Sequence, residues 1–257
     1  MQNIYILFMH FFIYSVIGWL LEVIYCKIID GKFYNRGFLN GPYCPIYGFG
    51  AISIILLLQR FEYNPILIFV FGLLLTSILE YITSFLMEKI FNAKWWDYSK
   101  EKFNIYGRVC LKNSIMFGLL ALILIYGLNP LITKFVDLFN VDYLYKIVNL
   151  IFVLMVIDCS VTVMEIINLK EKLMDLKEFT ETIIKEKNIF NENSDAAKKL
   201  DEFKEKLISK KDILNNHLLK AFPNLTFKEN HIEFLKIKEL IKEKKEKIKI
   251  TNKIKQK

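Results

Sequence analysis

The sequence predicts an all-α, polytopic membrane protein with about five transmembrane helices and a cytoplasmic helical tail. The chain of 257 residues is 54% hydrophobic, and its charges are unevenly distributed. Residues 1–167 carry 12 Lys/Arg and 11 Asp/Glu, whereas residues 168–257 carry 23 and 16. Ten glycines and five prolines are few for a turn-rich all-β fold. We therefore predict two domains, a transmembrane domain over 1–167 and a Lys-rich cytoplasmic helical tail over 168–257.

Five apolar stretches define the transmembrane domain. A transmembrane helix needs about 20 mostly apolar residues, and the candidates are 4–26, 45–58, 65–87, 109–127 and 146–167. The second stretch is the shortest and reaches a sufficient length only if Cys44 and Gln59 extend it. We include it because the charged loops cannot otherwise be arranged consistently on the two sides.

The distribution of Lys and Arg predicts the orientation. These residues concentrate in the loop between the first and second spans, in the loop between the third and fourth, and in the tail. With five spans, all three regions fall on one side, which we expect to be cytoplasmic. The N-terminus is then outside the cell, and the C-terminus is in the cytoplasm. The first span lacks the basic start and the small-residue cleavage site of a secretory signal.

The cysteines give no sign of a metal site. Cys26, Cys44, Cys110 and Cys159 show no CxxC spacing and no paired histidines. Structural zinc needs four converging ligands, so we interpret the four thiols as small buried apolar groups. No metal and no cofactor are expected.

Ionisable residues inside the spans are the first candidate site. Such a residue costs about 2.5–3.5 kcal/mol on insertion scales, and Glu22, Glu80 and Asp158 all lie within predicted spans. We interpret them as a substrate path or polar membrane cluster. For Glu22 and Glu80, the alternative is snorkelling to the interface or pairing with a nearby Lys or Arg. His10, in the outer half of the first span, suits a packing contact better than proton transfer.

The two Lys-rich loops supply a second candidate cluster. Residues 35–48 contain three Gly and two Pro, which impose a defined non-helical path. The second loop combines aromatic residues, an acid and a single Arg. The candidate residues of both loops are Arg36, Asn40, Tyr43, Trp96, Asp97, Asn104 and Arg108. Two interpretations are open for these residues. In the first they bind a ligand or a partner. In the second they form an ion-pair lattice that joins Arg36 or Arg108 to Glu22 or Glu80.

The tail is predicted to be helical. Residues 168–190 continue the fifth span with an imperfect heptad pattern, and further helices are expected over 196–222 and 230–250. The tail packs on itself, forms a short coiled coil for self-association, or contacts anionic lipid headgroups through its lysines. It contains no Arg and few aromatic residues, and acids accompany its lysines along the same helices, so nucleic-acid binding is not expected.

Three motifs together resemble a known family. They are Gly18-Trp19-Leu20-Leu21-Glu22, the loop 35–48, and the pair of stretches 95–99 and 104–111. They are similar to the bacterial "putative ABC-transporter type IV" permease family over roughly residues 5–165. The tail stretch 221–225 is similar as well. The resemblance implies a multi-span bacterial membrane protein that works as a permease.

Three functions are compatible with these patterns. The first is a permease-like subunit of an ABC-type transporter. The chain has no GxxxxGK[ST] phosphate loop, so the ATPase would be a separate chain. Five spans are few for a complete pathway, which implies a homodimer or a partner subunit. The second is a scaffold or sensor that recruits partners through its tail. The third is an enzyme acting on a lipid headgroup, although no recognisable catalytic motif supports it.

Overall fold

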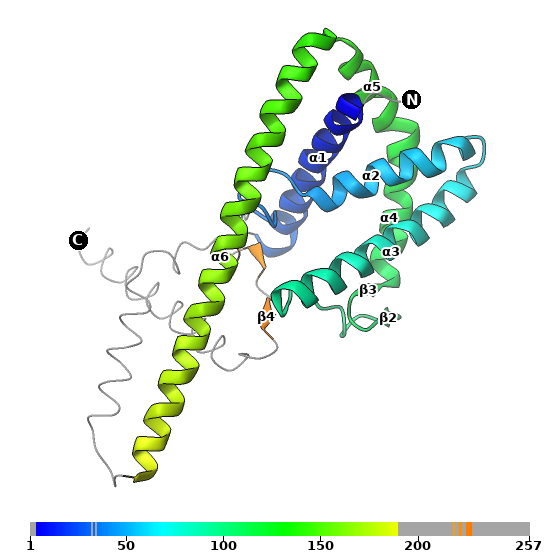
Figure 1. Cartoon of the computed structure of the whole chain (residues 1–257). Helices are drawn as coiled ribbons and strands as arrows, with labels where there is room; N and C mark the ends of the chain where they lie inside the picture. Colours follow the sequence, from blue (N-terminus) through cyan, green and yellow to red (C-terminus); the bar gives the residue numbers. More distant parts are fainter. Residues whose placement is uncertain are drawn as a thin grey trace, which may run out of the picture. The chain divides into compact units, whose positions relative to one another are not determined.

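The computed structural model describes residues 4–31, 33, 35–189, 218, 221–222 and 225–227. Long helices dominate this part of the chain (Figure 1). The helices are α1 (Ile4–Asp30), α2 (Pro45–Leu58), α3 (Pro65–Phe91), α4 (Leu111–Ile123), α5 (Asn129–Asp137) and α6 (Val141–Ile189). The short strands are β1 (Ala93–Lys94), β2 (Asn104–Ile105), β3 (Val109–Cys110) and β4 (Thr226–Phe227). The predicted all-α, polytopic fold is confirmed.

All five predicted spans are helical, but they differ in length. Four helical segments are long and apolar enough to cross a membrane: Ile4–Ile28, Pro65–Phe91, Leu111–Asp137 and Val141–Asp175. The second predicted span is α2, which has 14 residues. At a rise of about 1.5 Å per residue it is about 21 Å long, shorter than a hydrocarbon core of about 30 Å. A single 3₁₀ turn, Gln59–Phe61, extends it towards α3.

Local sequence signals explain where α3 begins and ends. Asn64 precedes the helix, and its Oδ1 accepts hydrogen bonds from the backbone N–H groups of Ile66 and Leu67, at 3.1 and 3.3 Å. Pro65 occupies the first helical position, where its missing N–H costs nothing. Asn92 ends the helix with φ 58°, in the left-handed region that asparagine tolerates.

A π-helical turn joins α4 to α5. It covers Leu124–Leu128, immediately before Asn129 and Pro130. Proline lacks an N–H and its ring clashes with the carbonyl four residues earlier, so a widened turn accommodates it within a continuous helix. The predicted fourth span, 109–127, therefore extends further than expected, to Asp137.

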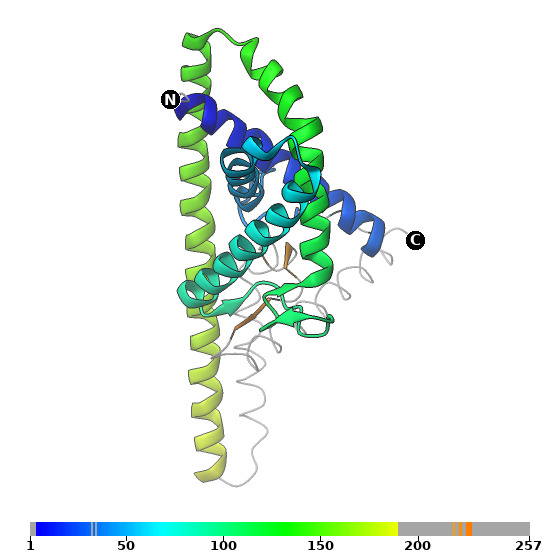
Figure 2. The same cartoon turned by 90° about the vertical axis from the view of Figure 1, so that its right-hand side faces the viewer.

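Glycines allow neighbouring helices to pack closely. Helices α1 and α2 are neighbours, as are α2 and α3, and α3 and α4 (Figures 1 and 2). A Cβ atom at Gly48 would lie 2.6 Å from the Phe11 carbonyl oxygen. A Cβ atom at Gly72 would lie 2.6 Å from the Cβ of Ala121. Small residues at such crossings are typical of helix packing in membranes.

Helix α6 has 49 residues and begins close to α1. The rings of Tyr5 and Tyr145 are 4.3 Å apart, and those of Phe8 and Phe152 are 5.8 Å apart. The predicted continuation of the fifth span as a helix is confirmed as far as Ile189. The helix predicted over 230–250 lies outside the described residues. So does the helix predicted over 196–222, except for residues 218, 221 and 222. Coiled-coil association remains a prediction.

The chain divides into two compact units. The first contains Met1–Thr162 and His217–Leu225, and the second contains Val163–Asn216 and Thr226–Lys257. Among the described residues of the tail segment His217–Leu225, Leu218, Ala221 and Leu225 are at most 1% exposed. The domain boundary after residue 167 stays a prediction, since α6 passes through it without a break.

Candidate functional site

The two loops that follow α1 and α3 meet at one end of the first unit. Phe38 of the first loop and Trp95 of the second pack edge to face, with ring centroids 5.1 Å apart. Phe222 of the tail segment packs on Trp95 at 5.0 Å. The two loops are therefore on the same side of the helices. We call the surface made by residues 35–44 and 92–110 and by Ala221 and Phe222 of the tail the loop face.

Arg36 links this face to α1. Its Nε–H donates to the Cys26 Sγ at 2.8 Å, and its Nη1–H donates to the backbone oxygen of Ala221 at 3.0 Å. A planar guanidinium can serve two such acceptors at once, whereas a lysine ammonium is a point charge on a flexible stem. The role supported by these contacts is to join the first loop to the tail segment.

Asn35 organises the first loop, and sequence reasoning missed it. Its Oδ1 accepts hydrogen bonds from Trp19 Nε1 at 2.6 Å and from the Gly37 backbone N–H at 3.2 Å. Its Nδ2 donates to the Asn40 carbonyl at 2.8 Å. One amide therefore holds both ends of a turn and attaches it to α1. The available signal was the tendency of asparagine to form an Asx-turn with the backbone N–H two residues later, which here belongs to Gly37.

Asp158 of α6 anchors the same loop. Its carboxylate accepts hydrogen bonds from the backbone N–H groups of Asn40 and Gly41, at 3.0 and 2.8 Å, and from the Tyr43 hydroxyl at 2.6 Å. The Asn40 Nδ2 also donates to the Thr162 Oγ1 at 3.1 Å. The pKa of Tyr43 is raised, chiefly by burial and then by its hydrogen bond to Asp158. We call this contact set the Asp158 clasp.

Glu22 and Glu80 have tyrosine partners instead. The Tyr47 hydroxyl donates to Glu22 Oε1 at 2.5 Å, and the Tyr98 hydroxyl donates to Glu80 Oε1 at 3.2 Å. Glu80 is 7% exposed, and its Oε2 has no hydrogen-bond partner among the described residues. Burial, then the charges of Glu80 and Glu22, raise the pKa of Tyr98. We call Glu22, Tyr47, Glu80 and Tyr98 the carboxylate–tyrosine cluster.

The three in-span acids therefore occupy two arrangements. The recorded partners of Asp158 are loop residues, and the recorded partners of the two glutamates are tyrosines. Glu22 and Asp158 lie 18 and 17 residues after the starts of their helices. At about 1.5 Å per residue both are about one hydrocarbon thickness from those starts. Asp158 is 17 residues from either end of the candidate span Val141–Asp175, and it contacts the first loop from there.

The second loop is shaped by its own polar side chains. Asp97 Oδ1 accepts hydrogen bonds from the Ser99 N–H at 3.0 Å and the Ser99 hydroxyl at 2.5 Å. That hydroxyl hydrogen bond lowers the pKa of Asp97. Asn104 accepts from the Gly107 N–H at 3.0 Å, within the antiparallel pair β2–β3. Trp96 Nε1 donates to the Arg108 carbonyl at 3.0 Å.

Arg108 pairs with Glu88, an acid that the sequence did not single out. Its Nη2 lies 2.6 Å from Glu88 Oε2, and its guanidinium lies 5.3 and 5.2 Å from the rings of Tyr81 and Phe85. All three partners belong to α3. The sequence analysis considered Glu22 or Glu80 as the partner. The sequence does not show how α3 is rotated about its axis, so it does not show that Glu88 is the acid that faces the second loop.

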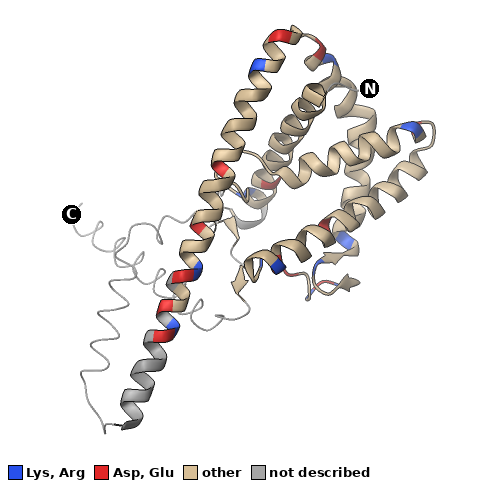
Figure 3. Ribbon diagram, in the orientation of Figure 1, with Lys and Arg blue, Asp and Glu red and all other residues tan. Residues whose placement is uncertain are grey.

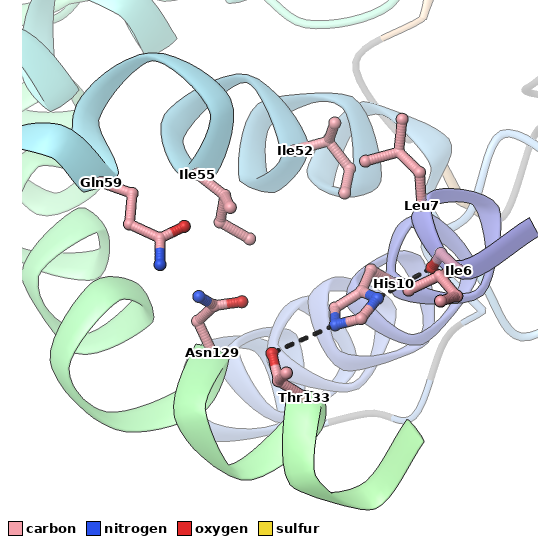
Figure 4. Close-up of a pocket in the computed structure, with 8 residues that line it drawn as sticks. All are labelled: Ile6, Leu7, His10, Ile52, Ile55, Gln59, Asn129 and Thr133. Atoms are coloured by element: carbon pink, nitrogen blue, oxygen red, sulfur yellow. Dashed lines mark hydrogen bonds between the residues drawn. The ribbon is translucent and has the colours of Figure 1, made fainter. Parts of the chain in front are cut away.

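A separate cavity of about 150 Å³ lies among the halves of α1, α2 and α5 away from the loop face (Figure 4). His10 Nδ1 lies 2.8 Å from the Ile6 carbonyl, and Nε2 lies 3.3 Å from Thr133 Oγ1. The carbonyl can only accept, so Nδ1 carries the proton and Nε2 accepts from the threonine. Asn129 accepts from the Tyr14 hydroxyl at 3.0 Å. His10 therefore makes packing contacts, as predicted.

The described residues contain no group of three or more His, Cys, Asp or Glu that could hold a metal ion. The thiols of Cys26, Cys44 and Cys110 are buried, as predicted, but Cys159 is exposed, so the prediction of four buried thiols is wrong at this position. Charged residues are sparse within the helices of the first unit and gather near helix ends and loops (Figure 3). The chemistry available near the loop face comes from carboxylates, tyrosine hydroxyls and Arg108.

These features define an all-α, multi-pass membrane protein with polar groups gathered at one end of its helices. A family model described as "Putative ABC-transporter type IV" matches residues 9–163. The chain belongs to this family, because the match covers more than half of its length. No curated protein and no solved structure matches the chain. The resemblance drawn from the loop motifs is confirmed, and the protein is a transporter-related membrane protein.

Proposed function

We propose that this chain is the permease-like subunit of an ABC-type transporter whose ATPase is a separate chain. The observation that carries the proposal, besides family membership, is the loop face. Two loops and a tail segment far apart in sequence are joined there by Phe38, Trp95 and Phe222 and by the Arg36–Ala221 hydrogen bond. A separate ATPase needs such a fixed surface to transmit its motions to the helices.

The loop face is the cytoplasmic face in this proposal. Residues 31–44 and 92–110 carry six of the 12 Lys and Arg of residues 1–167, whereas the connections 59–64 and 138–140 carry only Arg60, and such an excess is the bias of cytoplasmic loops. The N-terminus then lies outside a bacterial plasma membrane and the tail lies in the cytoplasm. Glu22 and Glu80 line the cytoplasmic end of the substrate path, and the Asp158 clasp fixes the loop beside it. A homodimer supplies the additional helices that a complete path needs.

The test is purification of the tagged chain from its native membrane in a gentle detergent, with identification of the proteins retained. We expect an ATP-binding chain in stoichiometric amount. Phe222→Ala should reduce its recovery several-fold, because Phe222 joins the tail segment to Trp95. Tyr63→Ala, at an exposed position between α2 and α3, is the matched control and should retain it. A clean wild-type protein without any ATP-binding chain would contradict the proposal.

A second candidate is a scaffold or sensor that recruits partners through its tail. The contacts of Ala221 and Phe222 favour it, because they attach the tail to the loops. Deletion of residues 228–257 separates the two functions, since it preserves segment His217–Leu225. The permease proposal predicts that the ATP-binding chain is retained by this variant. The scaffold proposal predicts that bound partners are lost.

A further inference from the structure

Glu22 and Glu80 come from different helices, but the charges of both act on one hydroxyl group, that of Tyr98, which donates a hydrogen bond to Glu80 at 3.2 Å. Burial has the largest effect on the pKa of Tyr98, and the charges of Glu80 and Glu22 raise it further. Both carboxyl groups are therefore within electrostatic range of Tyr98. Each also accepts a hydrogen bond from a tyrosine, Tyr47 or Tyr98. Two acids thus share one small polar region inside an apolar bundle.

No positive side chain accompanies this pair in the part of the chain that the structure describes. The ion pair found near the loop face joins Arg108 to Glu88, and neither Glu22 nor Glu80 has a lysine or arginine within ion-pair distance there. The other ionisable neighbours are Cys44, Tyr47, Tyr98 and Cys110. Each of these is neutral or, when ionised, negative. Glu80 is also 93% buried, and its Oε2 is unpartnered among the described residues.

Two neighbouring carboxylates without a counter-charge are unfavourable in an apolar environment. Like charges disfavour each other's ionised form, and burial adds a desolvation cost. One positive charge between them removes most of both costs. Tyrosine hydroxyls already occupy one oxygen of each acid, which leaves Glu80 Oε2 as a ligand atom.

We propose that Glu22 and Glu80 together bind one monovalent cation, either a proton or an alkali metal ion. Such a site gives the chain a means of responding to, or moving, a cation at the loop end of its helices. For its biological role the inference rests on the proposed permease function. Its chemistry does not, because cation binding needs neither the ATPase nor a transported substrate.

The test uses the full-length protein in lipid nanodiscs. Infrared spectroscopy at neutral pH detects the carbonyl stretch of a protonated carboxyl group. Calorimetric titration with sodium or potassium chloride, balanced by choline chloride, detects an alkali ion. The variants are Glu80→Gln and Glu22→Gln, and the control is Glu62→Gln, an exposed acid in the loop between α2 and α3. Because Glu22 is less buried than Glu80, Glu22→Gln keeps the test valid if Glu80→Gln fails to fold.

A proton predicts a carboxyl band in the wild-type protein that Glu80→Gln abolishes and Glu22→Gln weakens, because burial still disfavours ionised Glu80 when the charge of Glu22 is removed. An alkali ion predicts no such band, but saturable binding of one ion that either Gln variant abolishes. Glu62→Gln should change neither result. The inference is overturned if folded wild-type protein shows neither signal, or if the signal in Glu22→Gln is the same as in the wild-type protein. Absence of a co-purifying ATPase would refute the proposed function and leave this result unaffected.

Discussion

At the scale of residues, the acids inside the spans were visible in the sequence, but their partners were not. Glu22, Glu80 and Asp158 stand out because charge is rare in apolar stretches. Their partners depend on which loop folds over which helix. Asn35, Glu88 and Tyr98 gave no comparable signal, since a polar loop residue or an acid at a helix end is ordinary. Tertiary contacts alone show that these residues complete the site.

Asp158→Asn should destabilise the protein by about 2 kcal/mol, the usual worth of hydrogen bonds to a charged group. The amide that replaces the carboxylate keeps one acceptor oxygen, whereas three donors converge on Asp158. Thermal unfolding in detergent measures the change, and trypsin should cut the first loop faster. Asp142→Asn, an exposed acid in the first turn of the same helix, is the control. Equal stability of the two variants would show that the clasp is dispensable.

Tyr98 predicts a loss of stability in alkali. Its pKa is raised above the ordinary value of 10.0, chiefly by burial, so the unfolded chain releases this proton before the folded chain does. The contribution of Tyr98 to the free energy of unfolding is therefore intact below about pH 10. It declines as the pH rises above that value, by up to about 1.4 kcal/mol per pH unit. Tyr98→Phe should flatten the dependence of unfolding on pH in this range.

Tyr106→Phe is the control for that measurement, because Tyr106 is 79% exposed. It should leave the alkaline slope as in the wild-type protein. An unchanged slope in Tyr98→Phe would mean that the hydroxyl ionises equally easily in the folded and unfolded chains, contrary to its buried position.

At the scale of elements, hydrophobic runs predicted the helices of the membrane domain except α5, which lies beyond the predicted end of the fourth span. Charges and helix-ending residues set the approximate bounds, as at Asn64-Pro65 before α3. Two features were less accessible. Apolar content does not distinguish a 14-residue helix that stops short from one that spans, as α2 shows. The helical segment that begins with α4 continues through Asn129-Pro130 into α5 by means of a π turn, which composition does not reveal.

Close helix packing predicts the effect of adding a methyl group. A Cβ atom at Gly118 would lie 2.8 Å from Phe69 Cε2, and one at Gly72 would lie 2.6 Å from Ala121 Cβ. Gly118→Ala and Gly72→Ala should each destabilise the protein by about 1–3 kcal/mol, the usual cost of overpacking. Gly50→Ala is the control, because nothing lies within 4 Å of its Cβ position. Unfolding midpoints in one detergent compare the three, and a loss confined to Gly50→Ala would contradict the helix arrangement.

At the scale of the whole molecule, the charge bias predicted that both Lys-rich loops share one side, and the Phe38–Trp95 contact agrees. Family membership was also accessible, because its motifs are long. The return of segment His217–Leu225 to the loops was not predicted. Its residues lie within a charged tail, and an apolar face there suits tail packing as well as docking on the membrane domain.

The most direct measurement of the central claim is site-specific photo-crosslinking in native membranes. A photoreactive phenylalanine analogue replaces Tyr106, which is exposed in the second loop, or Tyr63, which is exposed between α2 and α3. The account predicts that the analogue at position 106 captures an ATP-binding chain and that the analogue at position 63 does not. Capture from position 63 alone, or no ATP-binding chain from either position, would contradict a permease that meets its ATPase at the loop face.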